Sequence, residues 1–192
     1  MLRGSEQVVF HGRGGQGATS TVPYLVLALD LEGKYAQSLP NFGGERRGSP
    51  VKVSLRISDE PIVIREAIAE PSCIVVLDTK LMAIVNVAAG LRPGGIAVLN
   101  TVSPPDEVDL GISLSITGTL DATAISEEVF GRRPIPLTCM PMLGGFAAAT
   151  GWIGIDSIAD AVSRKMDAAL VRNSLRALRV GYEATRVEGR YA

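Results

Sequence analysis

A short apolar run that ends in a glycine-rich turn constrains the fold of this chain more than any other feature. Residues 8–10 are apolar, and His11-Gly12-Arg13-Gly14-Gly15-Gln16-Gly17 follows directly. Such a run predicts a buried strand, and the pattern of residues 18–31 predicts a helix, with Pro23 in its first turns. Gly12, Gly14 and Gly17 fit the spacing G-x-G-x-x-G at the strand-to-helix turn. Glycine there permits a tight turn and lets a ligand approach bare N–H groups.

The start of the helix after this turn favours an anion. Its unpaired N–H groups and the positive end of the helix dipole stabilise a phosphate or a carboxylate. Two interpretations of the glycines stay open at this point. Either they serve only close packing of the strand on the helix, or the turn contacts an anion or a nucleotide.

A dinucleotide site needs a further element that this sequence does not have in the expected place. A carboxylate roughly 20 residues after the turn, at the end of the second strand, holds the ribose in such sites. Glu32 has about this offset, but it precedes Gly33 and the expected second strand over residues 34–39. We therefore do not expect the chain to bind NAD.

Size and composition indicate a folded globular protein. The chain has 192 residues, of which 46% are hydrophobic and 20% are charged, so we expect a single domain over residues 1–192. The formal net charge of −1 gives no reason to expect binding to nucleic acid or to an anionic membrane surface. No uninterrupted apolar run of about 18 residues and no secretory signal is apparent, so we expect a cytoplasmic protein.

The cysteines and the histidine restrict the chemistry available to the chain. Cys73 lies in an apolar run typical of a strand, and Cys139 stands apart near Pro141. Two isolated thiols cannot supply the four ligands of an iron–sulfur cluster or of a structural zinc site. His11 is the one histidine, so a centre with several histidines is excluded. We expect neither a metal site nor a catalytic residue in this chain.

The pattern of the remaining sequence predicts alternating strands and helices. Strands are expected over 34–39, 51–57, 73–77, 96–99 and 112–116, and helices over 60–69, 79–89 and 121–130. The strand over 51–57 alternates apolar and polar residues, which is typical of a half-exposed strand and compatible with a position at the edge of the sheet. These elements predict an α/β fold: a doubly wound, mostly parallel sheet of the Rossmann-like or flavodoxin-like kind. The glycine turn, Asp78 and Asn100 then share the carboxyl edge, where ligands sit in such sheets.

The C-terminal part is expected to be helical over 142–150, 155–164 and 167–187. In the last of these helices Met166, Leu170, Leu175, Leu178 and Tyr182 recur at helical spacing and predict a stripe that faces the core. Lys165, Arg172, Arg176 and Arg179 form a basic stripe elsewhere on it. That stripe is either a solvated face or a contact for an acidic partner or a nucleotide phosphate.

A second cluster, Glu45-Arg46-Arg47-Gly48, combines two guanidinium groups with flanking glycines. Arginine forks suit carboxylates and phosphates. Three interpretations remain: a surface loop with a local Glu–Arg pair, a contact between subunits, or a direct contact with a ligand.

Taken together, these motifs resemble one family. Gly12-Arg13-Gly14-Gly15-Gln16-Gly17-Ala18 and the stretch from Pro40 to Val51, with its core Phe42-Gly43-Gly44-Glu45-Arg46-Arg47-Gly48, are similar to the gamma subunit of 2-oxoacid:ferredoxin oxidoreductases, most of all the pyruvate enzyme. The resemblance continues in residues 75–78, 91–95, 121–125, 131–132 and 142–151, so it covers most of the chain in order.

The resemblance implies a subunit of an enzyme complex that decarboxylates a 2-oxoacid on thiamine diphosphate with Mg²⁺. Electrons then pass through iron–sulfur clusters to ferredoxin, and an acyl-CoA is released. In that family the partner subunits of alpha, beta and delta type hold the thiamine diphosphate and the clusters, so this chain is expected to hold no cofactor alone. Its expected contribution is structural, with a possible contact to CoA. The residues assigned to that contact are Gly12, Arg13, Gly14, Gly15, Gln16, Gly17, Arg46 and Arg47.

Two other classes of function remain open. The glycine spacing also suits a free-standing NAD(P)H- or flavin-dependent reductase, although the missing carboxylate argues against it. A regulatory module whose glycine turn senses an acyl-CoA or a nucleotide is the third possibility.

Overall fold

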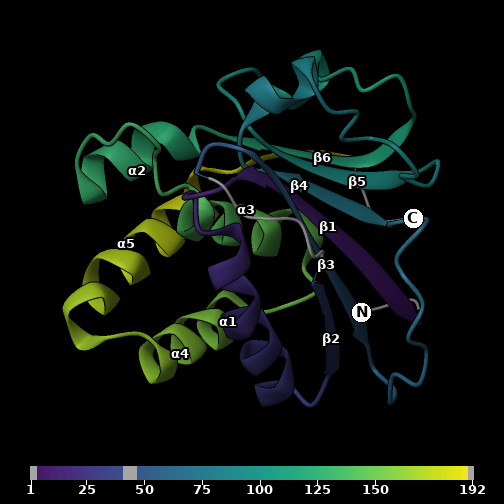
Figure 1. Cartoon of the computed structure of the whole chain (residues 1–192), viewed down its shortest axis with the longest axis horizontal. Coiled ribbons are helices and arrows are strands. Elements are labelled where there is room, and N and C mark those ends of the chain that lie inside the picture. Colours follow the sequence, from purple (N-terminus) through teal and green to yellow (C-terminus); the bar gives the residue numbers. More distant parts are fainter. Residues whose placement is uncertain (1–3, 41–46, 190–192) are drawn as a thin grey trace.

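The computed structural model describes residues 4–40 and 47–189. Seven strands of this part form one sheet in the order β2-β3-β1-β4-β5-β6-β7 (Figure 1). The strands are β1 (Ser5–Arg13), β2 (Tyr35–Pro40), β3 (Pro50–Ser58), β4 (Cys73–Val76), β5 (Gly95–Asn100), β6 (Leu114–Leu120) and β7 (Arg186–Gly189). The helices are α1 (Ala18–Leu31), α2 (Ala122–Phe130), α3 (Cys139–Thr150), α4 (Ile155–Lys165) and α5 (Ala168–Ala184), and the 3₁₀ turns are η1 (Thr79–Ala83) and η2 (Pro105–Glu107).

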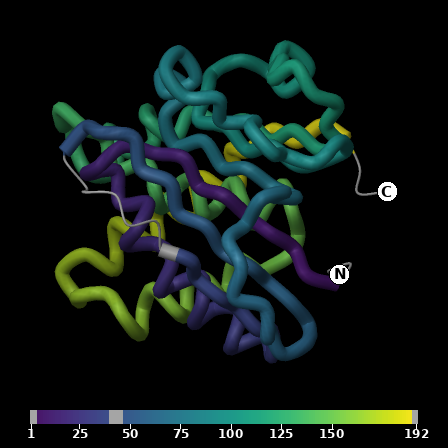
Figure 2. Tube along the Cα trace, turned by 45° about the vertical axis from the view of Figure 1, so that its right-hand side comes forward, coloured from purple at the N-terminus to yellow at the C-terminus, as the bar shows by residue number. Residues whose placement is uncertain are grey.

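Four parallel strands, β1, β4, β5 and β6, form the centre of the sheet. β3 pairs antiparallel with both β1 and β2, so it lies between the first two strands of the chain. At the other edge β7 pairs antiparallel with β6, and Figure 2 shows this yellow strand beside the teal β6. The expected α/β class with a mostly parallel core is confirmed.

The five helices gather on one side of the sheet, as Figures 1 and 2 show. Alternate residues of β1 point to this side, where Val8 and Phe10 join the larger apolar core. The ring of Phe146 in α3 lies 5.9 Å from that of Phe10 and 6.0 Å from that of Trp152, measured between centroids. These aromatic contacts attach α3 to the middle of the sheet. α1 runs unbroken through Pro23.

The opposite side of the sheet is covered by irregular segments, and here two expected helices are wrong. Residues 60–69 contain no helix, because Arg56, which is 3% exposed, donates to the backbone carbonyls of Ile64 and Glu66 and holds that segment in an irregular conformation. Of the expected helix over 79–89 only η1 exists. Beyond it the Asn86 side chain accepts from the N–H of Ala88, which favours a turn over a helix.

Other elements differ from the expected ones in place or burial. β3 is not an edge strand, and its polar Ser54 and Arg56 are buried rather than exposed. The strand expected over 112–116 is β6, which begins and ends later. The last helix ends at Ala184, and β7 follows where helix was expected. The apolar stripe predicted to face the core from the last helix is wrong in part: Leu178 is buried, but the exposed fraction is 56% for Leu170 and 40% for Tyr182.

Two glycines allow α3 and α5 to touch backbone to backbone. A Cβ added at Gly144 would lie 2.1 Å from the carbonyl oxygen of Leu178, and one at Gly181 would lie 2.2 Å from that of Pro141. Neither oxygen belongs to a flexible side chain, so an added methyl group has nowhere to go. The helix layer therefore depends on these two positions.

We predict that Gly144→Ala or Gly181→Ala lowers the free energy of unfolding by more than about 2 kcal/mol, because the helices must separate. Chemical denaturation measures this change. Gly145→Ala is the matched control: its Cβ would meet side-chain atoms of Leu120 and Thr185, which can shift. Equal stability of all three variants would contradict the backbone contact between α3 and α5. Without that contact each substitution would be expected to stabilise its helix by about 0.5–1 kcal/mol.

His11 provides a pH-dependent contribution to stability. It is 7% exposed near the end of β1, opposite Lys52 of β3. Burial, together with the charge of Lys52, lowers the pKa of His11 from 6.5 to about 4. The unfolded chain therefore binds a proton below pH 6.5 that the folded chain does not bind until about pH 4, so stability falls as the pH drops through this window.

We predict that the free energy of unfolding falls by about 2 kcal/mol between pH 7 and pH 5 on account of this residue. His11→Gln removes that part of the pH dependence, whatever it does to the absolute stability, because His11 is the one histidine. Denaturation curves at pH 5, 6 and 7 for both proteins provide the measurement. Equal slopes against pH for the two proteins would contradict the burial of a neutral imidazole.

Candidate functional site

The glycine turn connects the end of β1 with the start of α1, as the sequence predicts. Gly15 and Gly17 have φ angles of +99° and +88°, which side chains rarely allow. A Cβ at Gly12 would lie 3.3 Å from Oε1 of Gln16 and 3.5 Å from Leu77, and one at Gly17 would lie 2.7 Å from the Sγ of Cys139. Gly12 and Gly17 therefore serve close packing, whereas Gly15 is exposed.

The hydrogen bonds of the turn leave several donors at its outer side. The N–H of Arg13 donates to Oε1 of Gln16 at 2.7 Å, so the Gln16 side chain closes the turn from inside. The N–H of Gly14 donates to the carbonyl of Ser49 at 2.9 Å. Among the described residues, no acceptor is found for the N–H groups of Gly15, Gly17 and Ala18. These amides are the ones an anion could use.

The segment that carries the predicted arginines is joined to this turn through its backbone. The N–H of Gly48 donates to the carbonyl of Gly14 at 2.9 Å, and Arg47 forms an isolated parallel bridge with Gly14. The Cγ of Arg47 lies 3.8 Å from the position that a Cβ of Gly15 would take. Arg46, the other predicted arginine, lies outside the described residues. The structure thus brings Arg47 to the glycine turn.

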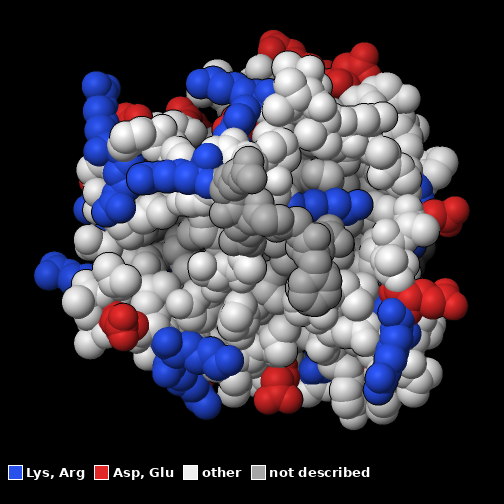
Figure 3. Space-filling view, in the orientation of Figure 1, with Lys and Arg blue, Asp and Glu red and all other residues white. Residues whose placement is uncertain are grey.

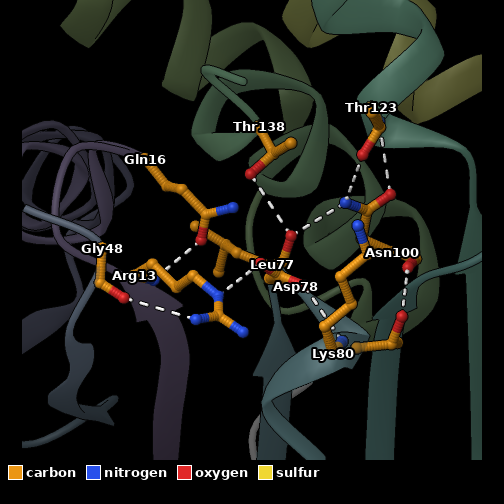
Figure 4. Close-up of polar contacts among 10 residues, drawn as sticks. Arg13, Gln16, Gly48, Leu77, Asp78, Lys80, Asn100, Thr123 and Thr138 are labelled. Carbon is orange, nitrogen blue, oxygen red and sulfur yellow. Dashed lines mark hydrogen bonds and ion pairs between the residues drawn. The ribbon is translucent and has the colours of Figure 1, made fainter. Parts of the chain in front are cut away.

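Arg13 connects three segments of the chain at the carboxyl edge of the sheet (Figure 4). Its Nε donates to Oδ2 of Asp78 at 2.7 Å, and its Nη1 donates to the carbonyl of Gly48 at 3.3 Å. Oδ1 of the same carboxylate accepts from the N–H of Lys80 and caps η1. Arg13 therefore clamps the segment of Arg47 and the end of β4 onto the glycine turn.

A second polar group at this edge fixes the ends of β4 and β5. Nδ2 of Asn100 donates to the carbonyl of Leu77 at 2.8 Å and to Oγ1 of Thr123 at 2.9 Å. Thr138 donates to the same carbonyl of Leu77 from the start of α3, as Figure 4 shows. The sequence predicted Asp78 and Asn100 at this edge, but not Thr123 and Thr138. Thr123 lies in the first turn of the helix expected over 121–130, and Thr138 lies four residues before the one expected over 142–150.

A hollow of about 240 Å³ opens beside the turn. Its lining consists of the turn itself, the first residues of α1, one residue of β3 and one before α3: Arg13, Gly14, Gly15, Gly17, Ala18, Thr19, Ser20, Val51 and Leu137. The N-terminal dipole of α1 and the guanidinium of Arg13 make this hollow favourable for negative charge. Val51 and Leu137 were not predicted, because they come from distant parts of the chain.

The thiols show no sign of reactivity. Cys73 is fully buried in β4, and burial raises the pKa of its thiol. Burial also raises the pKa of the Cys139 thiol, to about 11. Within residues 4–40 and 47–189, no group of three or more His, Cys, Asp or Glu side chains is arranged to hold a metal ion.

Glu32 is remote from the turn, as expected, because it follows the other end of α1. Its Oε2 accepts from Lys34 and its Oε1 from the N–H of Gly154. Burial alone would raise the pKa of Glu32, but hydrogen bonds from Lys34, Ser157 and Gly154 lower it overall. The carboxylate supports the junction of α1 with α4.

The part of the chain that the structure describes contains no helix long and apolar enough to cross a membrane.

Comparisons with known proteins agree on one family. The family described as pyruvate ferredoxin/flavodoxin oxidoreductase matches residues 7–184. The chain is 43% identical, over 183 residues, to the pyruvate/ketoisovalerate oxidoreductases common subunit gamma of Pyrococcus furiosus, with 94% of this chain and 97% of that protein covered. It is also 43% identical, over 178 residues and 92% of each chain, to the gamma subunit of NADH-dependent phenylglyoxylate dehydrogenase from Aromatoleum evansii.

A solved structure shows the same arrangement of elements. The crystal structure of the pyruvate oxidoreductase subunit PORC from Thermotoga maritima superposes with a TM-score of 0.79 at 30% identity, covering 97% of this chain and 99% of that one. Sequence and fold comparisons therefore both extend along nearly the whole chain. The chain belongs to the pyruvate ferredoxin/flavodoxin oxidoreductase family, as a gamma subunit of a 2-oxoacid:ferredoxin oxidoreductase.

Proposed function

We propose that this gamma subunit contacts the diphosphate of CoA, a substrate of the assembled oxidoreductase, through its glycine turn and Arg47. The observation that carries the proposal is the hollow of about 240 Å³ at the start of α1. Its wall includes the N–H groups of Gly15, Gly17 and Ala18, for which the described residues offer no acceptor. Charge-assisted hydrogen bonds from such amides to phosphate oxygens are stronger than those to neutral acceptors.

Arg47 adds positive charge beside the glycine turn. Its backbone is held by the bridge to Gly14, and its aliphatic part passes Gly15. Because Arg47 is exposed, its guanidinium is free to reach an anion bound at the turn. Arg46 is assigned the same role by the resemblance alone and stays a prediction.

Arg13 acts differently in this proposal, because two of its nitrogens are already engaged. Its bonds to Asp78 and to the carbonyl of Gly48 orient the segment of Arg47 toward the turn. Arg13 is thus a positioning residue, whereas the amides and Arg47 touch the diphosphate. Gly12 and Gln16 shape the turn from inside and do not need to meet the ligand.

The redox and decarboxylation chemistry is assigned to partner subunits of alpha, beta and delta type. There thiamine diphosphate with Mg²⁺ supplies the decarboxylation, and iron–sulfur clusters deliver electrons to ferredoxin. The described residues of this chain do not fit these groups: its thiols are separate, with raised pKa values, and no metal-binding cluster is arranged among them. The chain therefore binds and orients substrate for chemistry that takes place on other subunits, in a complex assigned to the cytoplasm.

A free-standing NAD(P)H- or flavin-dependent reductase is the weaker interpretation. β3, which begins at Pro50, lies between β1 and β2, so the end of β2 is one strand farther from the turn than the ribose-binding strand of a dinucleotide site. The relatives whose lengths the chain nearly spans are subunits of oxidoreductases.

We predict that Arg47→Ala in the assembled complex raises KM for CoA about tenfold, because one charge-assisted contact with phosphate is lost. We expect kcat and KM for the 2-oxoacid to change less than twofold. Acyl-CoA formation at varied CoA measures this effect. Arg172→Ala, an exposed arginine on α5, is the matched control and leaves KM unchanged. An unchanged KM in the Arg47 variant would remove this residue from the CoA site.

The variant Asp78→Asn tests whether Arg13 positions the Arg47 segment or binds the diphosphate of CoA directly. The asparagine keeps an acceptor for the N–H of Lys80 but loses its charge toward Arg13. If Arg13 positions the Arg47 segment, KM for CoA rises in Asp78→Asn and in Arg13→Gln. The double variant is then within about twofold of the worse single variant, because the two residues act as one unit.

A decrease in KM for CoA in Asp78→Asn would contradict a positioning role of Arg13. If Arg13 bound the diphosphate directly, neutralising Asp78 would free its charge and lower KM for CoA. The double variant would then behave like Arg13→Gln alone. Both outcomes are read from the same titration of CoA against the rate of acyl-CoA formation.

A further inference from the structure

A second cavity lies on the other side of the first turn of α1, among the helices. It is about 380 Å³ in volume, within the range of small-molecule sites. Its walls come from α1, from the connection between α2 and α3, and from the connection between α4 and α5. Most of the exposed lining is apolar: Tyr24, Phe130, Leu137, Met140, Met166 and Leu170.

We propose that this cavity binds a small organic anion with an apolar body, such as a medium-chain or aryl carboxylate. The inference concerns a site separate from the proposed CoA contact and does not depend on it. The two hollows share Gly17, Ser20 and Leu137 as a common wall, and the Cys139 thiol packs against Gly17 on the side of the second cavity.

The apolar lining calls for an apolar body. Met140 and Ser174 are each 4% exposed and form the deep part of the cavity. Leu170 also lines it yet is 56% exposed, although its helical spacing predicts a position in the core. A large apolar side chain in this position gains from a ligand that covers it, since burial contributes about 25 cal/mol per Å² of apolar surface.

The charged residues of the lining determine the sign and the number of ligand charges. Arg133 and Lys165 are exposed, and neither forms an ion pair with any described residue. Their sequence neighbours are engaged: Arg132 pairs with Glu127 at 3.1 Å and Arg164 with Asp160 at 2.7 Å. Asp167 lines the same cavity, so two cations and one carboxylate leave one positive charge, which matches a monoanion.

The surface agrees with this distribution of charge. Figure 3 shows basic side chains over α2 and over the end of α4, with mainly uncharged surface between them. These are the elements that carry Arg133 and Lys165 to the cavity. An anionic head group is therefore attracted to the mouth, while its apolar body enters between α1 and α5.

The test uses the full chain and the probe 8-anilinonaphthalene-1-sulfonate, an aromatic monoanion that fluoresces in apolar surroundings. Octanoate is the competitor. Octanol, which has the apolar body without the charge, and inorganic phosphate, which has the charge without the apolar body, are the two control compounds. We expect octanoate to displace the probe, octanol to do so about tenfold more weakly, and phosphate not to do so at the same concentration.

Adjacent residues provide matched controls. Arg133→Ala and Lys165→Ala each weaken octanoate binding about threefold to tenfold, and Arg132→Ala and Arg164→Ala change it less than twofold. All four side chains are exposed, so we expect the four variants to fold like the parent chain. Equal effects of the members of each pair would show that only general surface charge matters, and would overturn the proposal.

The place of binding is read by NMR of chains with ¹³C-labelled methionine methyl groups. Octanoate shifts the signals of Met140 and Met166, which line the cavity, and leaves the signal of Met82 unchanged, since Met82 lies in η1 and lines another hollow. Unmoved signals of Met140 and Met166 refute the site. If CoA moves these two signals and competes with octanoate, the cavity belongs to the coenzyme, which also overturns the proposal.

Discussion

The pairing of Gly14 with residues 48 and 49 is the constraint on which the site depends. Two backbone hydrogen bonds of 2.9 Å join these segments. They place the start of β3 beside the end of β1, where a dinucleotide-binding sheet would have its second strand. The glycine turn therefore faces an arginine-bearing segment instead of a ribose-binding carboxylate. The contact with an anion that we propose for this edge therefore depends on the topology as much as on the glycines.

The same strand links this site to the core. Phe10 lies three residues before Arg13 in β1, and its ring packs against Phe146 of α3. α3 in turn meets α5 through Gly144 and Gly181, and the carbonyl of Leu77 accepts from Thr138 just before α3 begins. A displacement of α3 would thus reach the end of β4, where Asp78 holds Arg13. The geometry at the carboxyl edge is supported by the tightest helix contact of the described structure, although no residue of that contact lines the glycine hollow.

Local patterns predicted the elements that carry the site, and they failed where a distant side chain decides the conformation. β1, α1, β4, β5 and α2 lie where the apolar pattern of the sequence predicts them, and Asp78 and Asn100 lie at the same edge as the turn because parallel strands share a carboxyl edge. The helix predicted over 60–69 is not present, because the buried guanidinium of Arg56 donates to two backbone carbonyls of that segment, and this contact has no signature in the local sequence. The local sequence of β7 continues the helical pattern of α5 and does not predict a strand, because the strand depends on pairing with β6, about 70 residues earlier in the sequence. The bond from Arg13 to Asp78 is equally long-range, so the sequence indicated both residues but not their pairing.

His11 and the two cysteines indicate that the contact we propose for this subunit relies on geometry and fixed charge. Burial and Lys52 lower the pKa of His11 to about 4, so its imidazole is neutral at pH 7. The pKa of Cys139 is raised to about 11, and burial raises that of Cys73 as well, so both thiols are protonated at the same pH. None of these three groups exchanges a proton near neutral pH, and a protonated thiol is a poor nucleophile and metal ligand. What the chain offers a substrate at pH 7 is a permanent guanidinium and a set of backbone amides. Both act by position, so in the CoA contact that we propose the clamp of Arg13 on the Arg47 segment matters more than any acid or base.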